Sequence, residues 1–134
     1  MSEFVEFVRR GAAKITPQVL KRVHNKLPML KLQFAQIHAP SFPHLVPQLQ
    51  LLANLVEDFV DDKADEVPLV TVAAACFAII YAQRQWDLIP DPIEDVGRMD
   101  DSGVVRVVLM EHERVLSDYA SRQGFSWQSI GVKP

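Results

Sequence analysis

Apolar residues recur every three or four positions along most of this chain, which is the period of an α-helix. The longest such run lies between residues 20 and 37. Its apolar positions form a single seam: Leu20, Val23, Leu27, Leu30, Phe34 and Ile37. Thr16 followed by Pro17 predicts where this helix begins, because a capping hydroxyl and then proline are typical of helix starts. Pro28 interrupts the seam and predicts a kink or a break near Asn25–Leu27.

A shorter apolar stripe precedes this seam. It consists of Phe4, Val5, Phe7 and Val8. The stripe predicts an N-terminal helix that Ser2 caps. Gly11 is expected to weaken or end that helix, since glycine is a poor helix former.

A third helix is predicted to begin between Ser41 and Pro47 and to extend to about Asp62. Pro40 and Pro43 exclude a regular helix before it. Its apolar face comprises Leu45, Leu49, Leu52, Val56, Phe59 and Val60. Its acidic residues, predicted to face solvent, are Glu57, Asp58, Asp61 and Asp62. Carboxylates at a helix C-terminus oppose the macrodipole, so this end is expected to be locally weak.

The most apolar stretch spans residues 67–83 and has no charged side chain. Residues 67–82 rise about 24 Å as a helix, which is shorter than the ~30 Å hydrocarbon layer of a bilayer. Small residues favour close packing by neighbouring helices, and here they are Ala73, Ala74, Ala75, Cys76 and Ala78. The pattern favours a buried central helix over one inserted in a membrane.

A polar, acidic connection is predicted at residues 84–101, between this helix and the next. Asp91 and Glu94 form a capping box around Pro92, which predicts a single short helix. Gly97 is expected to end that short helix in a left-handed conformation. Asp100 and Asp101 are then placed to cap the last long helix.

The last long helix is predicted to start at residues 100–102 and to run to about Ser121. Its apolar side is formed by Val104, Val105, Val108, His112, Val115, Leu116 and Tyr119. Gly124 is expected to end the regular structure. Phe125 and Trp127, in the tail, are expected to dock on the core.

Together these elements predict an all-α, single-domain bundle of about five or six helices over residues 1–134. It has a basic helical arm (1–44), a helical core (45–121) and a tail (122–134). With 49% apolar and 23% charged residues, the composition is that of a soluble globular protein. The five glycines and the lack of Asn-Gly turns argue against an all-β fold.

The lone cysteine, Cys76, cannot form an internal disulfide and lies in the apolar stretch. This indicates a reducing compartment. The N-terminal residues place acids before bases around a short apolar stripe, which is not the pattern of a secretory signal. A cytoplasmic location is therefore expected.

Charge is distributed unevenly. Residues 1–44 contain seven Lys/Arg and two Asp/Glu, for a net +5, whereas residues 45–101 contain three and twelve, for a net −9. One interpretation is two solvated faces of one domain. The other is a basic arm that contacts an anionic membrane surface. The candidates for that contact are Arg9, Arg10, Lys14, Lys21 and Arg22. Nucleic acid is disfavoured, because the arm has no interleaved aromatic residues and the pI is about 5.7.

The stretch from Tyr81 to Asp101 resembles the signature of the YkvA-like bacterial domains of unknown function. That signature reads Y-x-x-x-P-x-D-L-I-P-D-x-I-P-x-x-G-x-x-D-D. The matching residues are candidates for a functional loop: Asp87, Pro90, Asp91, Gly97, Asp100 and Asp101. Trp86, at an unspecified position just before Asp87, is a further candidate. The chain departs from the pattern at Gln85, Glu94, Asp95 and Arg98. The resemblance implies a helical domain associated with membranes and specifies no reaction.

Three functions are consistent with these patterns. The first is a non-catalytic interaction or structural module, peripheral to the cytoplasmic membrane, whose partner is unknown or is a second copy. A second copy would meet the 20–37 seam if the seam is not fully covered by its own chain. The second is a Mg²⁺ or Ca²⁺ site in the acidic loop 87–101, with Asp87, Asp91 and Asp95 as weak candidate ligands. The third is an enzyme in which His112 forms an acid/base pair with a loop aspartate. Motifs of known catalytic sites are absent from the sequence, so no catalytic residue or cofactor is assigned.

Overall fold

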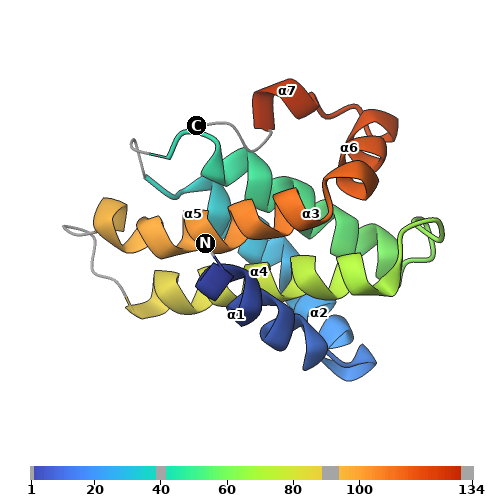
Figure 1. Ribbon diagram of the computed structural model, residues 1–134, viewed down its shortest axis with the longest axis horizontal. Coiled ribbons are helices and arrows are strands. Elements are labelled where there is room, and N and C mark those ends of the chain that lie inside the picture. The colour runs from blue at the N-terminus through green and yellow to red at the C-terminus, as the bar shows by residue number, and fades with distance from the viewer. Residues whose placement is uncertain (1, 39–41, 89–93, 131–134) are drawn as a thin grey trace.

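The computed structural model describes residues 2–38, 42–88 and 94–130 (Figure 1). The helices are α1 (Ser2–Ala13), α2 (Pro17–Ala35), α3 (Leu45–Val60), α4 (Leu69–Leu88), α5 (Glu94–Glu111), α6 (Glu113–Arg122) and α7 (Trp127–Ile130). Six of them have ten residues or more, and α7 is a single turn. The described residues contain no strand, so the predicted all-α bundle is confirmed.

Helix α4 is the centre of the bundle and packs against α1, α2, α3 and α5. Helices α4 and α5 lie side by side and antiparallel (Figure 1). Residues 71–76 of α4 are all buried, as expected for the predicted central helix. Its first two residues, Leu69 and Val70, are instead exposed. Among the described residues, no helix has both the length and the apolar character that crossing a membrane would require.

Helix α2 begins as the sequence predicts. The Thr16 hydroxyl accepts a hydrogen bond from the Val19 backbone N–H at 3.2 Å, and Pro17 occupies the first turn. Of the kink or break predicted near Asn25–Leu27, the break is wrong, because α2 continues through Pro28 to Ala35. Burial of the seam on both sides of Pro28 offsets the loss of one backbone hydrogen bond.

The seam from Leu20 to Ile37 is buried within its own chain along its whole length. It therefore offers no exposed stripe to a second copy, and the condition under which we predicted a dimer through this seam is not met.

Gly11 does not end α1, which continues to Ala13. The glycine instead permits a close approach of α1 to α4. A Cβ atom at this position would lie 2.2 Å from the Phe77 ring. The helix continues through Gly11 because packing against α4 outweighs the low helix propensity of one glycine.

The acidic connection is shorter than predicted. Helix α4 extends to Leu88 and α5 begins at Glu94, so Gly97 lies inside α5 and does not stop a helix. Asp100 and Asp101 also lie within α5 and do not cap it. The buried valines that follow, such as Val104 and Val105, anchor α5, and each further residue of a formed helix adds one backbone hydrogen bond. Pro90 and Asp91 lie outside the described residues.

The last long helix is divided in two. Helix α5 ends at Glu111 and α6 starts at Glu113, with His112 at the junction in a non-helical conformation (φ −122°, ψ 29°). The prediction of one helix to Ser121 is therefore wrong. The expected stop at Gly124 is confirmed, since its φ is +82° after the end of α6. Phe125 and Trp127 are partly buried against the core, as predicted.

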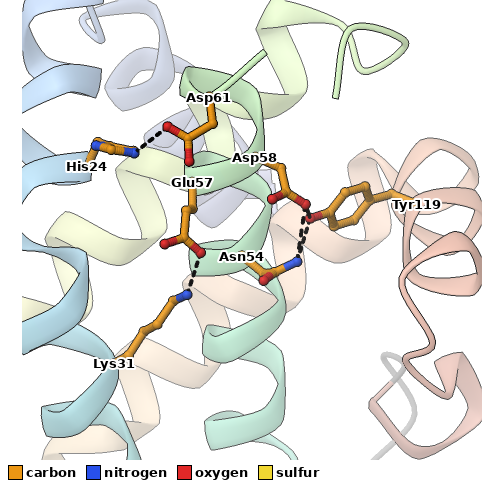
Figure 2. A network of polar contacts seen from close by, with 7 residues as sticks. All are labelled: His24, Lys31, Asn54, Glu57, Asp58, Asp61 and Tyr119. Atoms are coloured by element: carbon orange, nitrogen blue, oxygen red, sulfur yellow. Dashed lines mark hydrogen bonds and ion pairs between the residues drawn. The ribbon is translucent and has the colours of Figure 1, made fainter. Parts of the chain in front are cut away.

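Polar contacts join α3 to its neighbours along one edge of the bundle (Figure 2). Lys31 on α2 donates to Glu57 at 2.6 Å, and the His24 ring lies 3.0 Å from Asp61. On the other side, the Tyr119 hydroxyl of α6 donates to Asp58 at 2.6 Å. The prediction that the acidic residues face solvent is confirmed for Asp61 and Asp62, which are exposed, whereas Glu57 and Asp58 are half-buried. Glu57, Asp58 and Asp61 also have partners that the sequence did not indicate. They lie at the end of α3, where the partners offset their unfavourable interaction with the helix dipole.

Tyr119 completes this edge. Its hydroxyl also accepts a hydrogen bond from the Asn54 amide at 2.7 Å. Burial, and then the hydrogen bond to the Asp58 carboxylate, raise the pKa of Tyr119 well above its ordinary value. The hydroxyl therefore stays protonated and remains a donor to Asp58.

Candidate functional site

The predicted signature-loop residues are distributed over two helix ends. Trp86 and Asp87 lie in the last turn of α4, while Asp95, Gly97, Asp100 and Asp101 lie in the first half of α5. Pro90 and Asp91 are outside the described residues, and so are the side chains of residues 84–101. Groups of three His, Cys, Asp or Glu side chains arranged to hold a metal are not found in the described part of the chain. The Mg²⁺ or Ca²⁺ site in this loop stays a prediction.

The opposite end of the α4/α5 pair holds His112. Its Nδ1 atom lies 3.0 Å from the buried Thr71 hydroxyl of α4. Burial lowers the pKa of His112, and the nearby Glu111 carboxylate opposes that shift in part. The segment of α5 from Asp101 to His112 is about 16 Å long at 1.5 Å per residue. The aspartates of α5, from Asp95 to Asp101, therefore lie too far along the helix to form the predicted acid/base pair with His112, and Asp91 lies outside the described residues.

The basic residues of the arm lie on its exposed surface. Arg9 donates from Nε to a Glu111 carboxylate oxygen at 2.8 Å, which joins α1 to the end of α5. The contact with Glu111 raises the pKa of Arg9. Arg10, Lys14, Lys21 and Arg22 are exposed.

A groove of about 490 Å³ lies between α1, the start of α4 and the end of α5. Most of its lining is apolar, with a polar side formed by Arg9, Glu111 and His112. The apolar lining residues are Val8, Ala12, Ala13, Ile15, Leu69, Val70, Ala73 and Ala74. Two of them have large exposed side chains, since Leu69 is 57% and Val70 is 61% exposed.

Alanines account for the hollow. Ala12 and Ala13 on α1 line it together with Ala73 and Ala74 on α4, and short side chains on both helices leave the space between them unfilled. One row further round α1, Gly11 meets the Phe77 ring, which sets how closely the two helices approach. The sequence contains both alanine pairs, but only the fold shows that they line the same groove.

Polar atoms at the groove have unused hydrogen-bonding capacity. Arg9 uses only Nε in its contact with Glu111, so its two Nη groups have no acceptor among the described residues. His112 uses Nδ1 with Thr71, and its Nε2 atom has no partner among them. The groove thus combines an apolar surface with a small number of hydrogen-bonding groups, which is the usual composition of a small-molecule site.

The same groups do not form a nucleophilic centre. A hydroxyl beside an imidazole is the contact that activates serine or threonine nucleophiles, but Thr71 is fully buried. A carboxylate that orients the second imidazole nitrogen is also missing among the described residues. Cys76 is buried within α4, and burial raises the pKa of its thiol to about 12. That thiol stays protonated and unreactive at neutral pH.

Comparison of the chain with protein-family models, curated proteins and solved structures found no match. The resemblance to the YkvA-like domains remains a prediction that rests on residues 81–101. The function of the groove must therefore be argued from its own geometry.

Proposed function

We propose that this protein is a non-catalytic binding module and that the groove between α1, α4 and α5 is its binding surface. The observation that carries the proposal is an open apolar groove whose mouth exposes two large aliphatic side chains, Leu69 and Val70. Exposed aliphatic residues beside a hollow leave apolar surface in contact with water. A ligand that covers these residues removes that surface from water, which stabilises the complex. The volume of about 490 Å³ lies within the range of small-molecule sites.

Binding is favoured over catalysis because the polar groups near the groove are few. The Thr71 hydroxyl is hydrogen-bonded to the His112 Nδ1 atom, and Glu111 is paired with Arg9. The Nε2 atom of His112 could act as a base in the groove, but an enzyme also needs a reacting partner placed beside that base, and the described lining residues include no nucleophile.

A peripheral membrane role is the second candidate, and two exposed features favour it. Leu69 and Val70 could enter the lipid, and Arg9, Arg10 and Lys14 lie on the adjacent helix or follow it. Against it, Asp65 and Glu66 are exposed in the turn immediately before α4. An anionic bilayer would repel these carboxylates. A protein partner and a cytoplasmic location remain predictions.

The test is the binding of a neutral fluorescent probe, N-phenyl-1-naphthylamine, whose emission rises in apolar surroundings. The variant Leu69→Ser/Val70→Ser is expected to bind the probe several-fold more weakly than the wild type, because it removes the apolar mouth. The matched control is Met29→Ser/Leu32→Ser, which changes two exposed aliphatic residues on α2 (46% and 68% exposed) away from the groove. Equal loss of probe binding in the two double variants would contradict the proposal. A wild-type protein that does not bind the probe would also contradict it.

A further inference from the structure

We infer that the ligand of this groove is a single-chain anionic amphiphile, an alkyl chain with a carboxylate head whose chain lies between α1 and α4 and whose head meets Arg9. This inference rests on the proposed function and specifies the chemical class of its ligand. It follows from the shape of the apolar lining and from the distribution of charge around it.

The apolar lining is long and follows the helix axes. On α1 and the turn after it, the lining extends from Val8 to Ile15, which is about 10 Å at 1.5 Å per residue. On α4 it extends from Leu69 to Ala74 along the facing side. An alkyl chain lying along this space would contact both helices. Each methylene removed from water adds about 0.8 kcal/mol, so affinity should increase about fourfold for each added methylene until the groove is filled.

Among the described side chains on the α1 side of the groove, Arg9, Arg10 and Lys14 outnumber one nearby carboxylate, Glu6, so the charge there is net positive. Arg9 lines the groove, and its two Nη groups are without an acceptor among the described residues. Arg10 lies about 100° further round α1 than Arg9, and Lys14 lies in the turn after α1, so both are exposed near the groove without lining it. The one carboxylate in the lining, Glu111, is already paired with Arg9 Nε. A guanidinium with free donors matches a carboxylate head better than a neutral or cationic one.

The free amphiphile is favoured over a lipid in a bilayer as the source of this chemistry. The apolar surface is a hollow between helices, which an alkyl chain can enter from water. A bilayer would instead bring its anionic surface against the exposed carboxylates of Asp65 and Glu66 next to the groove mouth.

The experiment compares decanoate with decanol, which has the same chain and a neutral head, by displacement of N-phenyl-1-naphthylamine below micelle-forming concentrations. The variant is Arg9→Gln/Glu111→Gln, which removes the guanidinium without leaving the Glu111 carboxylate unpaired in the groove. Compared with Glu111→Gln alone, it is expected to weaken decanoate binding about three- to tenfold and to leave decanol binding unchanged, because the two proteins differ only in the charged partner of the head. The matched control is Lys31→Gln, which breaks an ion pair with Glu57 at 2.6 Å, between α2 and α3 and at residues that do not line the groove. It should change neither affinity.

A second arm measures octanoate, decanoate and dodecanoate, for which affinity should rise with chain length and then level off once the chain is longer than the lining of about 10 Å. Circular dichroism of Arg9→Gln/Glu111→Gln confirms that this double variant is folded. Equal decanoate binding by the double variant and by Glu111→Gln, when both still bind the probe and decanol, would overturn the anionic head and leave the proposed function standing. Failure of the probe, decanol and decanoate alike would overturn both. Arg9-dependent sedimentation with anionic phospholipid vesicles, without decanoate binding, would assign the surface to a membrane instead.

Discussion

Two regions of this bundle have similarly apolar sequences but differ in how they are packed. Along α3, the leucines Leu49, Leu52 and Leu55 are fully buried, and charged or polar partners from α2 and α6 close the edge of the core (Figure 2). Between α1 and α4, alanines line a hollow, and Leu69 and Val70 remain exposed at its mouth. The first region is closed and packed, and the second is open.

The difference lies in side-chain size and in what borders the apolar surface. Long side chains from facing helices interdigitate and fill the space between the helices. Alanine side chains on both helices are too short to fill it. On the closed side, ion pairs and hydrogen bonds lie where the core reaches solvent. On the open side, the polar groups retain free donors. Mutations should therefore change stability on the closed side and binding on the open side.

The largest expected effect compares two leucines. Leu55→Ala, on the closed side, should lower the free energy of unfolding by about 2–5 kcal/mol, because it leaves a cavity in a fully buried site. Leu69→Ala should change it by less than about 0.5 kcal/mol, because that side chain is already largely exposed. Urea unfolding measures both. A Leu69→Ala variant as unstable as Leu55→Ala would show that the groove is part of the core.

A smaller effect is expected at the closed edge. Tyr119→Phe keeps the ring and removes the hydroxyl that joins Asp58 and Asn54, which should destabilise the protein by about 1–3 kcal/mol. The control is Ser117→Ala on the same helix, whose hydroxyl makes only an exposed local bond to the Arg114 carbonyl. The free energy of unfolding should hardly change in the control. A neutral Tyr119→Phe variant would show that the network does not stabilise this edge.

The smallest effect concerns pH at the groove. Burial lowers the pKa of His112 below its unfolded value of 6.5, so the unfolded chain binds a proton at this site more readily than the folded one. Stability should therefore fall as the pH decreases from 6.5 toward the lower folded pKa, and level off below it. In His112→Asn, which can still hydrogen-bond Thr71, this part of the pH dependence should vanish. Thermal melts of both proteins between pH 5 and 7.5 measure the difference, and identical pH profiles would refute it.

Much of the fold can be predicted from the sequence, because helical periodicity and capping act locally. The seam from Leu20 to Ile37, the Thr16 cap and the buried α4 all follow from short-range patterns. Gly97 was misinterpreted because a glycine stops a helix only where packing does not hold it, and α5 is held by its buried valines. The break at His112 was missed because it coincides with a contact to Thr71, which is 41 residues away in the sequence.

The candidate site was less predictable than the fold. Arg9 and His112 were singled out from the sequence, the first for its charge and the second as a lone histidine on an apolar face. Their common position at one groove depends on α1 lying across the ends of α4 and α5, which no local pattern encodes. The acidic residues at the end of α3 were expected to be solvated for the same reason, since their partners on α2 and α6 lie far away in sequence.

Gly11 links the shape of the groove to the stability of the bundle. It lies against the Phe77 ring, whose centroid lies 5.4 Å from that of Phe7 and 6.3 Å from that of Tyr81. A larger residue at position 11 would overlap the Phe77 ring, so either that ring or α1 would have to move. A movement of α1 away from α4 would carry Ala12 and Ala13 with it and change the width of the groove. A single hydrogen atom in place of a methyl group thus sets the spacing on which any ligand of this groove depends.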